Sequence, residues 1–151
     1  MEKATFAAGC FWHVQHVFDK VEGVINSKVG YVGGEGIPSY ETAERLGHAE
    51  AIQIEFDQKK VSYEKLLDIF WKEHDPTSLN RQGPDVGNRY RSAIFYHNEE
   101  QKKIASFSLK KQQEKLQKKI VTQIVLAKEF FPAEEYHQKY FEKNKNMSCR
   151  L

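Results

Sequence analysis

Apolar and polar positions alternate over several short stretches of this chain, as they do in half-buried β-strands. The clearest case is AEAIQIEF over 49–56, where the two types exchange at nearly every position. Each stretch is bounded by glycine, proline or polar residues that are typical of turns. The predicted strands are 3–8, 24–32, 49–56, 92–96 and 122–127.

Between these strands, apolar residues recur at the three- and four-residue spacing of a helix. Val14, Val17 and Phe18 follow this spacing, and Ser62 has the character of an N-cap in front of another such segment. The predicted helices are 11–20, 63–73, 99–119 and a short helix that starts with Pro132 in its first turn.

The order of these elements is strand, helix, strand, strand, helix, strand, with a further helix, strand and helix behind it. This order favours an α+β protein, a two-layer sandwich with a split βαβ (ferredoxin-like) core and a mainly antiparallel sheet. No repeat or linker interrupts residues 1–151, so we expect a single domain with a polar, mobile tail at 144–151. Two long loops are expected at 33–47 and 74–91, and long loops in compact domains are often functional.

Composition narrows the classes of function. The net charge of +2 over 151 residues gives no indication of nucleic-acid binding, and no apolar run approaches the length of a membrane span. We therefore expect a cytoplasmic protein, monomeric by default, with no nucleic-acid or membrane partner. Two cysteines are too few for a disulfide scaffold or a cysteine-based zinc site, which leaves either inert burial or thiol chemistry.

Cys10 stands in the segment GCFW (9–12), where the first predicted strand passes into a helix. At the amino end of a helix, unpaired N–H groups and the helix dipole favour thiolate over thiol. Cysteine is also a small apolar residue that is often simply buried. Position alone leaves catalysis and burial about equally supported.

The other candidate groups also have two interpretations each. Phe11 and Trp12 are large core-forming residues, but neighbours on a helix point about 100° apart, so at least one could line a pocket. Glu50 at the start of a strand is either solvated or a desolvated acid that keeps its proton. The hydroxyl groups of Tyr40 and Tyr90 are either packed or available as neutral donors to a substrate oxygen.

The histidines and the second cysteine carry weaker signals. His13 and His16 have metal-ligand spacing but no third ligand, so no metal is predicted. His48 could pair with Cys10 as a base, although structural hydrogen bonding is the more common use of such a residue. Cys149 lies in the polar tail, where it is either incidental or able to reach an oxidised Cys10 and form a disulfide.

Taken together, several segments resemble the A-type peptide-methionine sulfoxide reductases, which act on the S epimer of the sulfoxide. The resemblance covers nearly the whole chain, and the order of its segments makes it specific. The segments are GCFW at 9–12, GYVGG at 30–34, PSYE at 38–41, GHAEAI at 47–52, FWKEHDPT at 70–77, NRQGPDVGNRYRSAIF at 80–95 and FPAEEYHQKY at 131–140.

The resemblance implies a role for each candidate residue, with no cofactor. Cys10 would be the nucleophile that becomes a sulfenic acid, and Phe11 and Trp12 would hold the S-methyl group of the substrate. Glu50 would protonate the sulfoxide oxygen. Tyr40 and Tyr90 would donate hydrogen bonds to that oxygen, and Asp85 would belong to the same polar network. Cys149 would resolve the sulfenic acid by forming a disulfide with Cys10. Thioredoxin or a similar dithiol would then reduce the disulfide.

The chain departs from the family's usual pattern next to the thiol. His13 and Gln15 stand where glycine and glutamate are common, and the segment between Tyr40 and Gly47 is shorter than usual. Three other functions remain as alternatives: a thiol peroxidase using Cys10, a cysteine hydrolase using Cys10 and His48, and a non-enzymatic binder that grips a methylated or aromatic group with Phe11 and Trp12.

Overall fold

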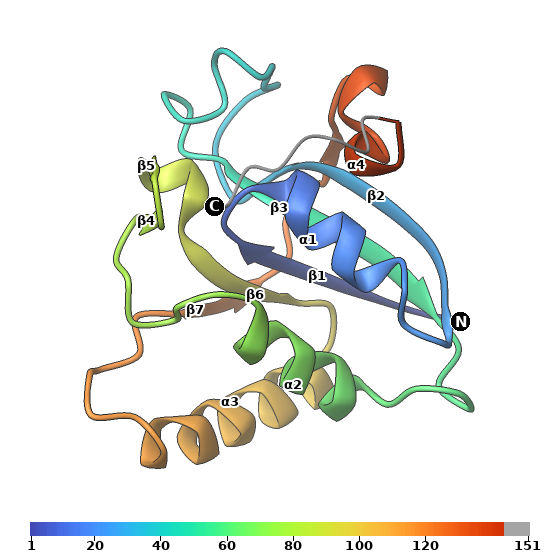
Figure 1. Cartoon of the computed structure of the whole chain (residues 1–151), viewed down its shortest axis with the longest axis vertical. Helices are drawn as coiled ribbons and strands as arrows, with labels where there is room; N and C mark the ends of the chain where they lie inside the picture. The colour runs from blue at the N-terminus through green and yellow to red at the C-terminus, as the bar shows by residue number, and fades with distance from the viewer. Residues whose placement is uncertain (144–151) are drawn as a thin grey trace.

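The computed structural model describes residues 1–143, so the expected mobility of the tail at 144–151, with Cys149 in it, lies outside the described residues. A six-stranded sheet forms the centre of the molecule, in the order β7-β6-β1-β3-β2-β8 (Figure 1). Its strands are β1 (Glu2–Ala8), β2 (Val24–Val32), β3 (Ala49–Phe56), β6 (Ser92–Tyr96), β7 (Gln123–Leu126) and β8 (Phe131–Pro132). The α-helices are α1 (Phe11–Phe18), α2 (Tyr63–Glu73), α3 (Glu99–Glu114) and α4 (Tyr140–Lys143).

Strand pairing in the sheet is antiparallel except between β6 and β7, which run parallel. The α+β class and the mainly antiparallel sheet are therefore confirmed. The predicted strand over 49–56 has the observed bounds of β3, and Ser62 caps α2 by accepting a hydrogen bond from the Lys65 amide at 3.1 Å.

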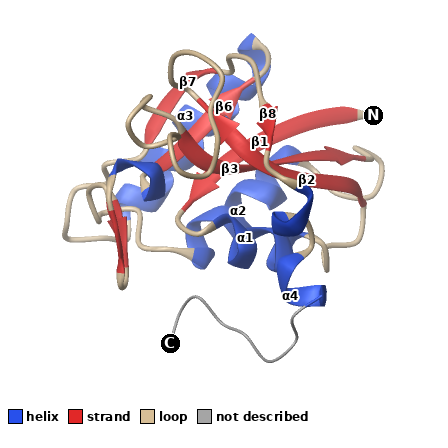
Figure 2. Cartoon of the chain, turned by 90° about the horizontal axis from the view of Figure 1, so that it is seen from above, coloured by secondary structure: helices blue, strands red, loops and turns tan. Residues whose placement is uncertain are grey.

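The alternating pattern divides the sheet into two faces. Residues such as Phe6, Ile52 and Ile94 point to the face covered by α1 and α2, which lie together on one side in Figure 2. Ala7, Ala51 and other small residues point to the opposite face, where the segment at 127–130 packs over them. Since β3 residues two apart share a face, Glu50 lies on the helical side with Ile52.

Phe6 lies at the centre of the larger core, with its ring 5.3 to 6.0 Å from the rings of Phe18, Tyr63 and Phe70. We expect Phe6→Ala to lower the free energy of unfolding by about 3–5 kcal/mol, because it removes a buried ring and leaves a cavity. Urea denaturation measures the change. Phe107→Ala is the matched control, since that ring is 65% exposed, and equal losses in the two variants would contradict this view of the core.

The helix predicted over 99–119 is wrong in its last part, because α3 ends at Glu114. The side chain of Gln113 donates to the Lys118 carbonyl and accepts from the Ile120 amide, which fixes a turn in place of another helical turn. The first helix also ends early, at Phe18 rather than residue 20.

The short helix predicted from Pro132 is also wrong at its start. Phe131 and Pro132 instead form strand β8, which pairs with Gly30 and Tyr31 at the edge of the sheet. A proline is compatible with an edge strand. Gly30 allows the close approach, since a Cβ atom there would be 2.3 Å from the Phe131 carbonyl oxygen. The chain then turns through a 3₁₀ segment, η2 (Glu135–His137), before α4.

The loop predicted at 74–91 contains structure of its own. Strands β4 (Arg81–Gln82) and β5 (Asp85–Val86) form a small hairpin, turning at Gly83 with φ of 55°, and a 3₁₀ segment, η1 (Asn88–Tyr90), follows. These elements bring Asp85 and Tyr90 to the end of the sheet where β1 passes into α1.

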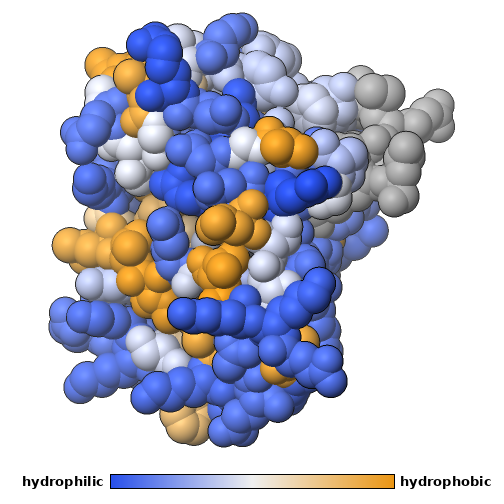
Figure 3. Space-filling view, turned by 90° about the vertical axis from the view of Figure 1, so that its left-hand side faces the viewer, coloured by the Kyte–Doolittle hydropathy of each residue, from blue (hydrophilic) through white to orange (hydrophobic). Residues whose placement is uncertain are grey.

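The side of the molecule that bears β4, β5 and β7 carries apolar surface among mostly hydrophilic side chains (Figure 3). Its exposed apolar residues are Leu79, Val86, Val125 and Leu126. Within residues 1–143, no helix has the length and apolar character needed to cross a membrane.

Candidate active site

Cys10 is the N-cap residue of α1, at the turn where β1 ends. Gly9 precedes it with φ of 92°, a conformation that glycine adopts without strain, and this sharp turn places the thiol at the amino end of the helix. The side chain is 6% exposed. The predicted position of the thiol at the helix end is therefore confirmed, and the side chain is buried rather than on an open surface.

Glu50 reaches the same helix end from β3. One carboxylate oxygen accepts from the amide of Phe11 at 3.3 Å, and the other accepts from Nε of Arg89 at 2.8 Å. The side chain of Glu50 is only 2% exposed. Burial raises the pKa of this carboxyl to about 7, against the opposing effects of the Arg89 charge and the Phe11 amide. Near neutral pH the group can therefore exist as an acid.

Two tyrosines from different loops meet beside this carboxyl. The guanidinium of Arg89 lies over the ring of Tyr40 at 4.5 Å and within 5.8 Å of the ring of Tyr90. Burial, and then the charge of Glu50, raise the pKa of both tyrosines, so their hydroxyl groups stay neutral donors. Asp85 belongs to the same group, because its charge raises the pKa of Glu50 and of Tyr90.

Phe11 and Trp12 lie in an aromatic cluster with residues from the C-terminal segment. Phe11 is 1% exposed and its ring is 5.3 Å from the ring of His137. Trp12 stacks on Tyr140 with centroids 3.8 Å apart and an angle of 9°. The ring of Tyr40 approaches His137 to 4.6 Å. The cluster forms an apolar, polarisable wall next to the helix end that carries Cys10.

His137 has a defined protonation pattern in this cluster. The Trp12 indole N–H donates to Nδ1 at 3.0 Å, so the proton of the neutral ring is on Nε2. Burial lowers the pKa of His137, which favours that neutral form. Among residues 1–143, Nε2 is buried without a hydrogen-bond partner, and it is therefore a donor available to a ligand.

The C-terminal segment that supplies His137 and Tyr140 is fixed to the sheet by side chains. Gln138 bonds both the amide and the carbonyl of Val29, at 3.0 and 2.9 Å. Glu134 accepts from the Tyr31 hydroxyl at 2.9 Å and from the Tyr40 amide at 3.1 Å. One segment thus positions both the aromatic wall and the loop that carries Tyr40.

A buried thiol at a helix end, an acid with a pKa near 7, neutral hydroxyl donors and an aromatic wall form one site. The family model for peptide methionine sulfoxide reductase matches residues 2–151. The chain belongs to this family. The reductase is 57% identical to a peptide methionine sulfoxide reductase of Methanosarcina acetivorans over 149 residues, which are 95% of this chain and 79% of that protein.

Solved structures agree with this assignment. The reductase is similar to Mxr1 of Saccharomyces cerevisiae in its reduced form, with a TM-score of 0.93 and 36% identity over 98% of this chain and 88% of that chain. It also resembles the structure of Mxr1 in complex with Trx2, with a TM-score of 0.69 and 30% identity over 92% and 84% of the two chains.

The described part of the reductase brings together the predicted residues Cys10, Phe11, Trp12, Tyr40, Glu50, Asp85 and Tyr90. Cys149 lies outside that part. The sequence analysis gave no part in the site to four further residues: Arg89, Glu134, His137 and Tyr140. The last three belong to the segment FPAEEYHQKY, so the resemblance of that segment to the family was the signal that could have identified them.

The histidines considered as bases or ligands have structural partners. Both ring nitrogens of His48 are occupied, by the Gly34 amide at 3.2 Å and the Gly36 carbonyl at 3.0 Å, which holds the loop that carries Tyr40. His13 pairs with Glu73 at 3.0 Å, tying α1 to α2. Among residues 1–143, no group of three histidine, cysteine or acidic residues could hold a metal ion.

Proposed function

We propose that this reductase converts the S epimer of methionine sulfoxide, free or in proteins, to methionine, with Cys10 as the nucleophile. The observation that carries the proposal is the convergence of the thiol with a protonatable buried carboxyl and an aromatic wall. A thiolate attacks electron-poor sulfur well, but the sulfoxide oxygen leaves only if it receives a proton.

Glu50 supplies that proton. A carboxyl with a pKa of about 7 is partly protonated at neutral pH, whereas an ordinary glutamate would be ionised. Tyr40 and Tyr90 donate hydrogen bonds to the same oxygen as negative charge develops on it. Burial is the main cause of the raised pKa of Glu50, and the negative charge of Asp85 adds to it. The donors are in place before the reaction, so little reorganisation is needed.

Phe11 and Trp12 hold the S-methyl group. Their rings form an apolar wall that favours a methyl group over the oxygen, so only one face of the chiral sulfur is presented to Cys10. This arrangement gives selectivity for one epimer. Tyr140 supports the wall by stacking on Trp12, and the Nε2–H of His137 is available to a polar group of the substrate.

The electron and atom balance involves a second thiol. Reduction transfers the sulfoxide oxygen to Cys10, so one methionine and one Cys10 sulfenic acid form. The thiol of Cys149 then attacks that sulfur, a disulfide forms and water leaves. Cys149 follows Tyr140, which lies on Trp12, by nine positions in the sequence, and an extended chain of that length spans at most about 30 Å. Thioredoxin reduces the disulfide by dithiol exchange.

We expect Cys149→Ser to reduce one equivalent of the sulfoxide but to lose turnover with thioredoxin. The first step needs only Cys10, whereas recycling by thioredoxin needs the disulfide. Methionine formed per enzyme is measured with and without thioredoxin, and intact mass shows either one added oxygen or the loss of two hydrogens. Unchanged thioredoxin turnover in Cys149→Ser would exclude this cysteine from the mechanism.

Arg89 positions Glu50 and holds its pKa down against burial. We expect Arg89→Met to lower kcat and to move the alkaline limb of the kcat–pH profile upward by about one unit or more, because a neighbouring cation stabilises the carboxylate. Arg45→Met is the matched control, since Arg45 is exposed in the loop at 33–47. A uniform loss at every pH, with the limb unmoved, would indicate a structural role only.

The alternatives make different predictions. A peroxidase would form the same sulfenic acid but needs no aromatic wall, and a hydrolase using His48 needs a ring nitrogen that is already bonded to the loop backbone. Each epimer of a methionine sulfoxide peptide is incubated with the protein and dithiothreitol. Reduction of the S epimer alone supports the proposal, and no turnover of either epimer would refute it.

We further infer that β1, α1, β2, β3, α2 and β6 form a two-layer split βαβ (ferredoxin-like) core. The order β6-β1-β3-β2 and its antiparallel pairings support this description. That the chain is a single domain, monomeric and cytoplasmic stays a prediction.

A further inference from the structure

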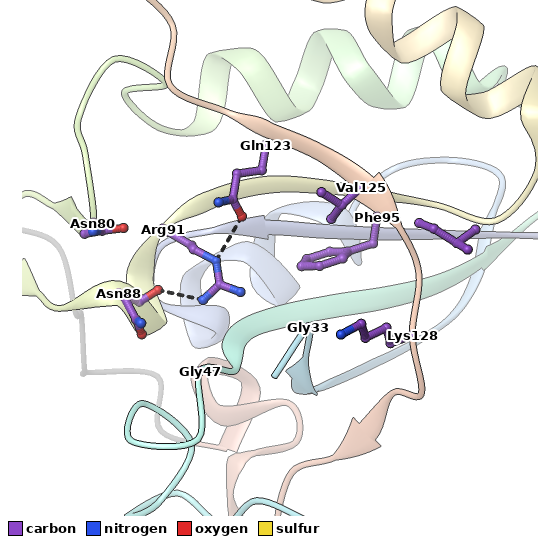
Figure 4. A pocket seen from close by; sticks show the side chains of 10 residues that line it. Gly33, Gly47, Asn80, Asn88, Arg91, Phe95, Gln123, Val125 and Lys128 are labelled. Carbon is purple, nitrogen blue, oxygen red and sulfur yellow. Dashed lines mark hydrogen bonds between the residues drawn. The ribbon is translucent and has the colours of Figure 1, made fainter. Parts of the chain in front are cut away.

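A second cleft lies on the face of the sheet opposite to α1, away from the aromatic wall. It has a volume of about 480 Å³ and lies between the loop at 33–47, the segment at 80–91 and the residues of β7 and its end (Figure 4). The ring of Phe95 forms the floor of the cleft. Val125 is the register partner of Phe95 in the parallel pair β6 and β7, so it lies on the same face of the sheet. None of the candidate catalytic residues lines this cleft.

The charge in the cleft is unbalanced. Arg91 and Lys128 line it, and within the described part of the chain no acidic residue does. Nε of Arg91 donates to the side-chain oxygen of Gln123 at 3.2 Å and Nη1 donates to the Asn88 carbonyl at 3.1 Å, so both acceptors are neutral (Figure 4). Among the described residues, no carboxylate pairs with this guanidinium.

Burial makes this imbalance costly. Burial lowers the pKa of Arg91, with no neighbouring negative charge to oppose it. A cation that is partly removed from water is normally compensated by an anion, because its lost hydration is otherwise not replaced. The remaining nitrogen, Nη2, lies beside Gly33 and Phe95, within the cleft; a Cβ atom on Gly33 would be 3.1 Å from it. The N–H groups of this third nitrogen therefore lie next to the space that a ligand would fill.

The rest of the lining fits an anion with an apolar body. Lys128 is 60% exposed at the rim, where it makes a 3.6 Å ion pair with the exposed Glu35. Phe95, Val125 and Leu126 provide an apolar side. The buried side-chain oxygen of Asn88 has no hydrogen-bond partner in residues 1–143, and rotation of its amide would present an N–H donor at the same place.

From these observations we propose that the cleft formed by Arg91, Lys128, Asn88 and Phe95 binds a small organic oxyanion, a carboxylate or a phosphate carried on an apolar group. The guanidinium takes the oxyanion through Nη2, Lys128 adds a second positive charge, and the apolar group lies against Phe95 and Val125. Guanidinium suits both oxyanions, because its donors are arranged in a fixed planar fork.

Calorimetric titration at constant ionic strength tests the proposal, with phenyl phosphate and benzoate as the two probes and benzyl alcohol as the neutral control. We expect saturable binding of at least one anion with a Kd on the order of 1 mM, typical of a small ligand held by a few polar contacts. Benzyl alcohol is expected not to saturate. The ratio of the two anion affinities then distinguishes a phosphate site from a carboxylate site.

Substitutions assign the binding to this cleft. We expect Lys128→Gln to weaken the anion at least about fivefold and Arg91→Gln to abolish saturation. Because Arg91 also holds η1 through the Asn88 carbonyl, Lys128→Gln is the deciding variant if Arg91→Gln does not fold.

The matched control is Lys110→Gln, because Lys110 is exposed on α3, away from the cleft. It is expected to bind the anion as the unsubstituted protein does. Equal affinity in Lys128→Gln and the unsubstituted protein, or no saturation by either anion, would overturn the proposal. Neither result depends on the reductase activity.

Discussion

Cys10→Ser is expected to reduce methionine sulfoxide at least about 10⁴-fold more slowly than the unsubstituted enzyme, in effect below detection. A serine hydroxyl at this helix end stays protonated at neutral pH, and oxygen is a far weaker nucleophile toward sulfur than thiolate. Loss of a covalent nucleophile removes a whole reaction step rather than one contact, which is why its effect exceeds that of any supporting residue.

The measurement is methionine formed from the S epimer with dithiothreitol as reductant. Cys149→Ser is the matched control, because it removes a thiol and retains the first equivalent of product. Thermal unfolding verifies that the fold is kept, as serine is close to cysteine in size. More than about 0.1% residual activity in Cys10→Ser would place the nucleophile elsewhere, since a loss of about 10³-fold or less is also what a supporting general acid accounts for.

Glu50→Gln is expected to lower kcat about 10²- to 10³-fold, the range typical of a general acid. The amide oxygen of glutamine can still accept from Nε of Arg89, but the bond that the other carboxylate oxygen accepts from the Phe11 amide is lost. The variant has no proton to deliver at any pH. The pH dependence of kcat separates this loss of the proton donor from the change in position.

The pH profile gives the sharper test. Because burial raises the pKa of Glu50 to about 7, kcat of the unsubstituted enzyme should fall as pH rises through that value and the carboxyl ionises. This limb should be missing in Glu50→Gln. Stability should follow the same titration: a pKa raised in the folded state makes the fold less stable as pH rises from about 5 to 8, and the glutamine variant should lose that slope. An unchanged alkaline limb in Glu50→Gln would assign it to another group.

The sequence was informative where chemistry depends on local position. The thiol of Cys10 lies at a helix end because an apolar strand, a glycine and an amphipathic helix follow one another, and this order can be read from the chain. Glu50 was a candidate because it stands at the start of a predicted strand beside apolar residues, where a carboxyl is either solvated or desolvated. Roles for both residues came from the motifs, and their positions came from the periodicity.

Partnerships across long sequence separations were not predictable in the same way. Arg89 meets Glu50 across 39 residues, and His137 meets Trp12 across 125 residues, so no periodicity links them. The pairing of β8 with β2 depends on the missing side chain of Gly30, and a proline beside it indicated a helix instead. In each case, contacts between segments that lie far apart in the sequence determine the structure, and the local sequence pattern does not show them.

The two unusual residues after GCFW also have partners that only the fold reveals. Gln15 is 1% exposed, donates to the Ser27 hydroxyl at 3.2 Å and accepts from the Lys139 amide at 2.7 Å. It therefore joins α1 to the segment that carries His137 and Tyr140. His13 pairs with Glu73 at 3.0 Å and so joins α1 to α2.

The side chain of Gln138 has a consequence for association between copies of the chain. By bonding both backbone groups of Val29, it acts as one residue of a neighbouring strand, and β8 continues the same row at Gly30 and Tyr31. The backbone of β2 from Val29 to Tyr31 is therefore already covered and is not open to an incoming strand. The opposite edge is β7, where Val125 and Leu126 are exposed. If partly unfolded copies aggregate through strand pairing, we expect the growth to start at β7, and Leu126→Lys to suppress it, because a charged side chain opposes pairing at an edge strand.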